Sequence, residues 1–195
     1  MRVLTKKANK DYPQFGIKKG DTYFQWSFFR QRPIKSKTYP TRGQLTQNEI
    51  LQGVYGAYDG SAPKTAEDVE ATADAVREAG SAAQDKYDNL PENFQQGENG
   101  QRFEEQANNC ESAADELSTI AEELQDEEGR TLPEKPAQGE GEDDDAYQAR
   151  LDALLEEAGI DDSATYYEFD EAGWTWTLNE DALQEAVSAT EPELG

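Results

Sequence analysis

The chain has 195 residues and a net charge of −24, and it is long enough for one ordinary domain or two to three small modules. Leu, Ile, Val and Phe number only 13, 5, 5 and 7, which excludes one large hydrophobic core and favours small packed units joined by disordered stretches. The chain has no histidine and one cysteine, Cys110, which excludes intrachain disulfides, cysteine clusters for zinc or iron–sulfur, and histidine-dependent catalytic or metal sites.

Residues 1–60 predict a small module that contains a β-hairpin and a helix. Residues 21–29 alternate and are rich in aromatic side chains, which is typical of a strand. After a turn that ends at Pro33, residues 34–39 return as the second strand. The side chains expected to face the core are Phe24, Trp26 and Phe28.

A helix is expected after this hairpin. It begins with a capping box at residues 46–49 and ends at Gly60. Its apolar stripe consists of Ile50, Leu51, Val54, Tyr55 and Tyr58. Because a hairpin alone is too small to be stable, we expect this helix to cover the core face of the hairpin.

Residues 61–128 predict an antiparallel helical hairpin. Apolar and small side chains recur at alternating spacings of four and three, which indicates a coiled-coil seam. On the first helix, which starts with a cap at Thr65 and Asp68, these are Val69, Ala73, Val76, Gly80, Ala83, Tyr87 and Leu90. On the second they are Phe103, Ala107, Cys110, Ala114, Leu117, Ala121 and Leu124.

The last third of the chain predicts a linker followed by a third small unit. Residues 129–145 are rich in Pro, Gly and acidic residues, which is typical of a disordered linker. Residues 146–195 predict an α-β-β-α unit: a helix ended by Gly159, a β-hairpin that turns at residues 170–173, and a helix capped by Asn179. The fold class expected for the whole chain is therefore α+β, mainly α.

Charge is distributed unevenly along the chain. Residues 1–50 hold eleven Lys and Arg and three acidic residues, a net charge of +8, whereas the remainder carries −32. Acidification of a halophilic protein would not leave the first fifty residues basic. This polarity favours an anionic partner for the basic N-terminal segment, or contact between that segment and the acidic remainder.

The basic segment is the main candidate binding site. Lysines and arginines could meet phosphates while tyrosines stack on bases. The candidate residues for binding nucleic acid or another anionic partner are Lys18, Lys19, Tyr23, Arg30, Arg32, Lys35, Lys37 and Tyr39. Lys35, Lys37 and Tyr39 are expected on one face of the second strand. In the alternative interpretation, the aromatic side chains form core and the lysines protect a strand edge.

The second predicted helix of residues 61–128 carries many carboxylates, which could imitate a phosphate backbone and occupy the groove of a DNA-binding protein. The candidate acidic face is Glu104, Glu105, Glu111, Asp115 and Glu122, continued by Glu116, Glu123, Asp126, Glu127 and Glu128. The alternative is an ordinary solvated helix exterior. Asp143, Asp144, Asp145, Asp161 and Asp162 could bind a hard cation, but they lack EF-hand spacing and are expected to be solvated. We expect no metal, no cofactor and no catalytic residue.

Two stretches of the sequence carry a resemblance to known proteins. The first is Gly16-Ile17-Lys18-Lys19-Gly20-Asp21-Thr22-Tyr23, continuing through Trp26 and Phe28 to Ser36-Lys37-Thr38-Tyr39-Pro40 and Leu45-Thr46-Gln47. The second is Asn89-Leu90-Pro91-Glu92 with Gln95-Gln96-Gly97, then the helix that bears Cys110 and Glu111. These stretches resemble a family of uncharacterised accessory proteins encoded by tailed bacteriophages, which offers no activity to carry over. In those proteins the hairpin turn is often Gly-rich, whereas here it reads Arg30-Gln31-Arg32-Pro33. The C-terminal unit falls outside the resemblance.

The resemblance implies a phage accessory protein in the cytoplasm of an infected bacterial cell. The sequence has no apolar leader and no run near the ~18 apolar residues of a membrane span, so we expect a soluble protein without membrane contact. The leading hypothesis is a non-enzymatic protein that binds nucleic acid, or a host or phage protein that handles it, through the basic segment. The alternatives are an acidic DNA mimic that inhibits a host DNA-binding enzyme in an anti-defence role, and a minor virion structural protein that oligomerises through the coiled coil.

Overall fold

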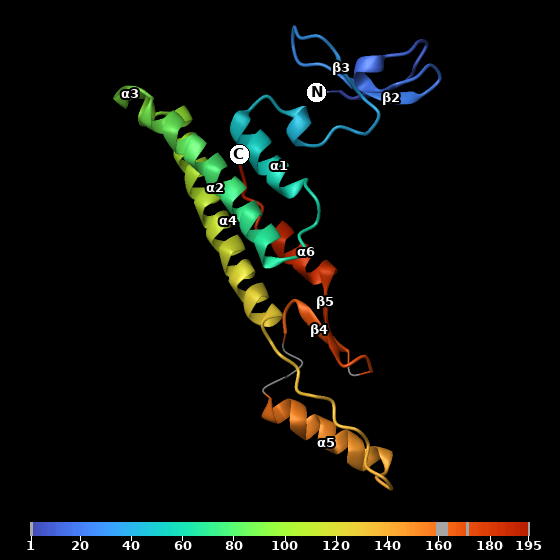
Figure 1. Cartoon of the computed structure of the whole chain (residues 1–195). Helices are drawn as coiled ribbons and strands as arrows, with labels where there is room; N and C mark the ends of the chain where they lie inside the picture. The colour runs from blue at the N-terminus through green and yellow to red at the C-terminus, as the bar shows by residue number, and fades with distance from the viewer. Residues whose placement is uncertain (1, 159–163, 171, 195) are drawn as a thin grey trace. The chain divides into compact units, whose positions relative to one another are not determined.

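The computed structural model describes residues 2–158, 164–170 and 172–194 (Figure 1). It is an α+β fold with long helices and two small sheets, as the sequence predicted. Gly159, Asp161 and Asp162, for which we expected a helix end and weighed a cation site, lie outside the described residues, as does Glu171 of the C-terminal turn.

The chain divides into two compact units. The first contains Met1–Gly60, Glu78–Ala107 and Leu194, and the second contains Ser61–Arg77, Asn108–Glu193 and Gly195. This boundary crosses both long helices, so residues 61–128, which we predicted as one helical hairpin, contribute to both units.

The first unit begins with a three-stranded antiparallel sheet. Strand β1 (Leu4–Lys7) pairs with β2 (Thr22–Trp26), which pairs with β3 (Ile34–Ser36). The predicted hairpin is β2 and β3. Strand β1 was not predicted, because Leu4-Thr5-Lys6-Lys7 has no apolar alternation and is held by pairing with residues that come much later in the chain.

The prediction for the buried face of β2 was wrong in part. Tyr23 and Trp26 are the two buried side chains of this strand, and because they are three positions apart they point to opposite faces. Tyr23 joins Ala8 and Ile17 in a small core against which Tyr12 packs. On the other face, the indole Nε1 of Trp26 donates to the carbonyl of Gln44, 3.2 Å away. Both faces of the strand are therefore covered, and the predicted core residues Phe24 and Phe28 are only half-buried.

Helix α1 (Glu49–Tyr58) follows, with Ile50 and Val54 buried. Its N-cap is Asn48, whose side chain accepts a hydrogen bond from the Ile50 amide, so the capping box predicted from Thr46 is wrong. Thr46 instead accepts from the Asn48 amide. At its C-terminal end the cap is Asp59, one residue before the predicted Gly60.

Helix α1 packs against α2 (Ala66–Asp88). A Cβ added at Gly53 of α1 would lie 3.2 Å from the Cβ of Ala79 on α2. The expectation that α1 covers the Phe24–Trp26 face stays a prediction, and the contact at Gly53 adds a helix–helix interface that was not predicted. Trp26 meets the short 3₁₀ turn Gly43–Leu45, which itself contacts α1.

The long helices of the hairpin are α2 and α4 (Glu98–Glu128), joined through the short helix α3 (Glu92–Gln95). The predicted cap of α2 is confirmed: Thr65 accepts from the Asp68 amide, and the Asp68 carboxylate accepts from the Thr65 amide. The predicted seam is buried at most of its positions, while Tyr87, Leu90 and Phe103 are half-buried. Its buried members are Val69, Ala73, Val76, Gly80 and Ala83 on α2, and Ala107, Cys110, Ala114, Leu117, Ala121 and Leu124 on α4.

The second unit ends in the predicted α-β-β-α arrangement. Its elements are α5 (Asp144–Glu157), β4 (Tyr167–Asp170), β5 (Thr175–Leu178) and α6 (Glu180–Ala189), and Asn179 caps α6 as expected. Disorder of residues 129–145 stays a prediction. In the structure, residues 129–143 contain no helix or strand, but the carbonyls of Pro133 and Pro136 accept hydrogen bonds from Trp174 and Tyr147.

Candidate anion-binding surface

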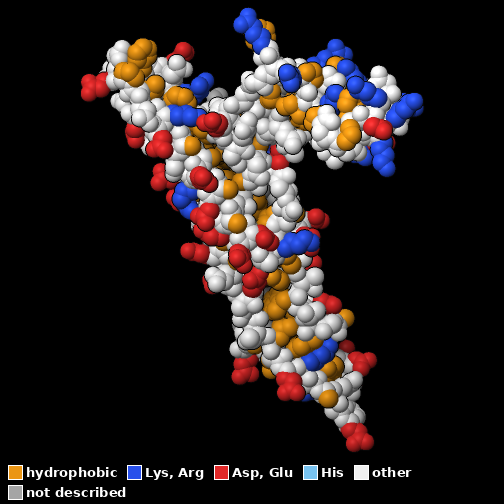
Figure 2. Space-filling view, turned by 45° about the horizontal axis from the view of Figure 1, so that its top comes forward, with side chains coloured by type: hydrophobic (Ala, Val, Ile, Leu, Met, Phe, Trp, Pro, Cys, Tyr) orange, Lys and Arg blue, Asp and Glu red, His pale blue; other side chains and the backbone are white. Residues whose placement is uncertain are grey.

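All eight residues of the predicted basic site lie in the first unit: six are on or between the strands of its sheet, and Lys37 and Tyr39 follow β3. Figure 2 shows that Lys and Arg side chains gather over this N-terminal sheet, while Asp and Glu side chains lie along the long helices. The side chains of Lys18, Lys19, Arg30, Arg32, Lys37 and Tyr39 are exposed, Lys35 is half-buried and Tyr23 is buried.

The connection between β1 and β2 presents Lys18 and Lys19 on a fixed backbone. The Asp21 carboxylate accepts from the Lys18 amide at 2.9 Å, and the Asp11 carboxylate accepts from the Lys19 amide at 2.6 Å. The Gly20 amide donates to the carbonyl of Ala8 at 2.8 Å. Both acidic residues of this connection thus bind backbone amides, and the two lysine side chains extend into solvent.

Asp21 also joins this connection to the segment that follows β3. Its carboxylate lies 3.2 Å from the Lys37 ammonium. The hydrogen bond from the Lys18 amide, followed by the one from Lys37, lowers the pKa of Asp21. The carboxylate therefore stays ionised at neutral pH and partly neutralises Lys37, which leaves Lys18 and Lys19 as the more available cations of the two segments.

Lys35 belongs to an aromatic cluster that the sequence did not predict. Its ammonium lies 3.8 Å from the ring centroid of Tyr12 and 6.0 Å from that of Phe15. The ammonium of Lys10 lies 5.7 Å from the same Tyr12 ring. Cations over aromatic faces are attracted by the ring quadrupole. The contact joins segments that are far apart in the chain, so no local pattern indicated it apart from the turn-forming run of residues 12–16.

The two tyrosines of the predicted site are placed very differently. Tyr23 is 4% exposed and tilted against Tyr12 at 5.9 Å, and burial raises its pKa, so it is a core residue with no ring face available to a ligand. Tyr39 is 62% exposed and meets Phe24 edge-on at 5.3 Å. Phe24 pairs with Ser36, the neighbour of Lys35, so the side chains of Phe24 and Lys35 lie on opposite faces of the sheet. Tyr39 contacts Phe24 and therefore, contrary to the prediction, does not share the face of Lys35.

The turn between β2 and β3 carries the most exposed aromatic side chain of the first unit. Phe29 is 84% exposed, and the guanidinium of Arg30 lies 4.9 Å from its ring centroid. Arg30 adopts φ 61°, the left-handed region that favours glycine.

The predicted acidic face of α4 is exposed at most of its positions. Glu104 and Glu105 belong to the first unit, and Glu111, Asp115 and Glu122 belong to the second. Glu127 is the exception. It is 6% exposed, and its two carboxylate oxygens accept from the backbone amides of Thr165 and Tyr166. Glu127 is therefore a structural acceptor, and its place on a solvated acidic face was predicted wrongly.

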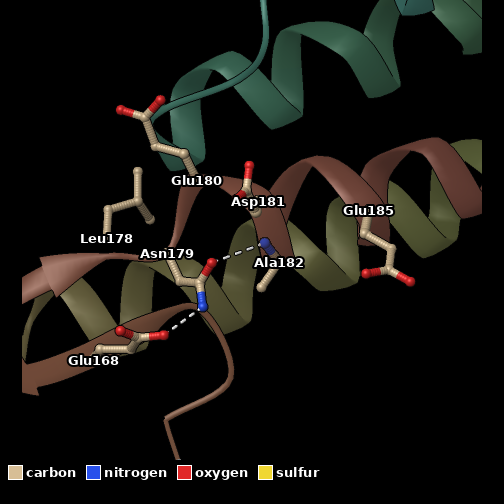
Figure 3. A pocket seen from close by; sticks show the side chains of 7 residues that line it. All are labelled: Glu168, Leu178, Asn179, Glu180, Asp181, Ala182 and Glu185. Carbon is tan, nitrogen blue, oxygen red and sulfur yellow. Dashed lines mark hydrogen bonds between the residues drawn. The ribbon is translucent and has the colours of Figure 1, made fainter.

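A separate acidic pocket lies at the start of α6 in the second unit (Figure 3). Its lining includes Glu168, Glu180, Asp181 and Glu185, and Asn179 donates to Glu168 at 2.6 Å while it caps the helix through the Ala182 amide. Glu180 is paired with Lys64 at 2.9 Å. Within the described residues, no three Cys, Asp or Glu side chains come together in a way that could hold a metal ion.

Cys110 is buried in the seam of α4, and burial raises the pKa of its thiol to about 11. The thiol is therefore protonated at neutral pH, as expected of a small core residue. In the part of the chain that the structure describes, no helix combines the length and apolarity needed to cross a membrane.

Comparison of the chain with protein-family models, with curated proteins and with solved structures finds no match.

Proposed function

We propose that this chain is a non-enzymatic binding protein whose N-terminal sheet binds nucleic acid, in an accessory role during phage infection. The observation that carries the proposal is the exposed set of cations Lys18, Lys19, Arg30 and Arg32 on the connections of the sheet. The amides of Lys18 and Lys19 are held by hydrogen bonds to the carboxylates of Asp21 and Asp11. The first fifty residues have a net charge of +8 in a chain of −24.

A polyanion gains affinity from such a surface mainly through release of its counterions, and a preorganised surface costs less to order on binding. The acidic remainder of the chain opposes binding at long range. At physiological ionic strength the Debye length is about 8 Å, so charges beyond the contact are largely screened. The expected affinity is therefore local to the sheet and depends strongly on salt.

The test is a titration of the full chain against a labelled oligonucleotide by fluorescence anisotropy, over a series of salt concentrations. Lys18→Glu/Lys19→Glu should weaken binding. For a single strand, removal of each phosphate-binding cation should also make the plot of log binding constant against log salt concentration less steep, by about 0.7 in its slope. The matched control is Lys64→Glu/Arg102→Glu, which changes the net charge equally outside the sheet. Absence of salt-dependent binding, or an equal loss in both double variants, would overturn the proposal.

A second candidate is the acidic DNA mimic. Glu111, Asp115 and Glu122 are exposed, and their spacings of four and seven residues place them on one stripe of α4. The full chain should then compete with duplex DNA for a basic DNA-binding enzyme, and Glu111→Gln/Asp115→Asn/Glu122→Gln should abolish the competition. Glu92→Gln/Glu98→Gln/Glu134→Gln, which removes three other exposed carboxylates, should not.

A further inference from the structure

We infer that the nucleic acid bound by the N-terminal sheet is single-stranded, and that its unpaired bases stack on the exposed rings of Phe29 and Tyr39. This inference rests on the proposed function and names the class of nucleic acid. The shared chemistry is that of unpaired bases on a phosphate backbone, in DNA or in RNA.

Exposed aromatic side chains are concentrated where the positive charge is. Among the described residues, the exposed large hydrophobic side chains are Phe15, Phe29, Ile34, Tyr39 and Phe94. Four of these five belong to the first 39 residues, which also hold ten of the eleven cations of the basic segment. Exposed aromatic rings beside cations are what single-strand binding requires, since every unpaired base presents a π-face.

Phe29 is held in the open rather than packed. The guanidinium of Arg30 lies over its ring at 4.9 Å, yet 84% of the side chain remains accessible. Arg30 reaches this position through a left-handed backbone, which is unfavourable for a residue with a Cβ. Strained residues of this kind cluster at ligand-binding sites, because the rest of the fold imposes them. The pair presents a ring for a base and a cation for the adjacent phosphate.

Tyr39 is positioned by its neighbours while most of its ring stays accessible. The preceding turn is fixed by Ser36, whose hydroxyl accepts from the Thr38 amide at 3.1 Å, and the next residue, Pro40, is buried. Phe24 meets the Tyr39 ring at an interplanar angle of 75°, so the contact involves the edge of one ring. A ring face is thus available for stacking without rearrangement.

Duplex nucleic acid fits this surface less well. Its phosphates are accessible, but its base faces are covered by neighbouring base pairs, and its groove edges are recognised by hydrogen-bonding side chains. Lysines and arginines alone would suffice for a duplex backbone. The exposed rings of Phe29 and Tyr39 gain a partner only when bases are unpaired.

The test compares three ligands of one sequence at one salt concentration, using anisotropy with the full chain: single-stranded DNA, single-stranded RNA and duplex DNA. Either single strand should bind more tightly than the duplex, and the DNA and RNA arms identify which is preferred. Phe29→Ala and Tyr39→Ala should each weaken single-strand binding by about 5-fold to 100-fold and leave duplex binding unchanged. Tyr39→Phe, which keeps the ring, should retain the affinity.

The control is Phe94→Ala, which removes an exposed ring of α3 outside the basic segment and should have no effect. Inorganic polyphosphate at equal phosphate concentration should compete poorly. Equal affinity for duplex and single strand, full competition by polyphosphate, or unchanged affinity in the Phe29 and Tyr39 variants would overturn the inference and leave charge-driven binding intact. Failure of every oligonucleotide to bind at low salt would instead overturn the proposed function.

Discussion

The carboxylate of Glu127, in the last turn of α4, accepts the backbone amide hydrogen of Tyr166, 39 residues later, at a distance of 2.8 Å. Its other oxygen accepts from the Thr165 amide. The hydroxyls of Tyr166 and Tyr167 lie 3.5 and 3.3 Å from the neighbouring carboxylates of Glu123 and Glu128. Three acidic side chains at the end of one helix thus hold the start of the C-terminal hairpin in the second unit.

Replacement of Glu127 should destabilise the protein. Glu127→Ala leaves two amide donors without their acceptor, and the expected loss is about 1–3 kcal/mol in the free energy of unfolding. Urea denaturation followed by circular dichroism measures the loss, and hydrogen exchange at Thr165 and Tyr166 should accelerate. Glu122→Ala, which removes an exposed carboxylate of the same helix, is the control. Equal stability of the two variants would contradict the structural role of Glu127.

The stability of the second unit should fall at alkaline pH through Tyr166 and Tyr167. Burial, followed by the nearby glutamate charges, raises the pKa of both hydroxyls above 10.0. The folded state therefore holds these protons more tightly than the unfolded state. The stabilisation is complete below about pH 10 and is lost as the pH rises through the raised pKa. Tyr166→Phe/Tyr167→Phe should flatten this decline, which urea titrations at a series of alkaline pH values measure.

The matched substitution for this experiment is Tyr39→Phe, which removes one exposed hydroxyl from the first unit. It should leave the alkaline decline as steep as in the unmodified chain. If the double variant loses stability with pH as steeply as Tyr39→Phe does, neither burial nor the contacts with Glu123 and Glu128 raise the pKa of the two hydroxyls.

Two glycines of α1 should respond to alanine by different amounts. A methyl group at Gly56 would meet only open space, so Gly56→Ala should stabilise the helix by up to about 1 kcal/mol through helix propensity. Gly53→Ala gains the same propensity but brings its methyl group within 3.2 Å of the Ala79 Cβ, so the packing of α1 on α2 must adjust and the net stabilisation should be smaller than that of Gly56→Ala. Thermal unfolding of both variants measures the difference. Equal stabilisation would show that α1 does not pack on α2 at this point.

Arg30→Gly should change stability and binding in opposite directions. Glycine relieves the steric strain of the left-handed backbone at φ 61°. The greater entropy of glycine in the unfolded chain offsets part of this gain, so the free energy of unfolding should rise by up to about 1 kcal/mol. Affinity for a single strand should fall, because the cation beside Phe29 is removed. Arg32→Gly removes the same charge without relieving a left-handed residue and should lower both quantities. A destabilised Arg30→Gly variant would argue against strain at this turn.

Patterns that act over a few residues were readable in the sequence. The cap of α2 at Thr65 and Asp68, the cap of α6 at Asn179 and the seam from Val69 to Ala83 all depend on neighbours within one or two helical turns. The alternation in β2 predicted a strand for the same reason. These elements were therefore predictable, together with the α+β class.

Tertiary structure decided which of these side chains are available to a ligand. Both faces of β2 carry aromatic residues, so its alternation could not show which of them is buried. Tyr23 is buried and Tyr39, which follows β3, is exposed because of segments that come from elsewhere in the chain. Pairing of β1, the contact of Lys35 with Tyr12, and the burial of Glu127 likewise join residues that are far apart in the chain. The sequence by itself determined the helices, the hairpins and the separation of charge, since these follow from local spacing and composition. Only the packing of distant segments decided which cations, rings and carboxylates are exposed, because burial depends on partners that no local pattern specifies.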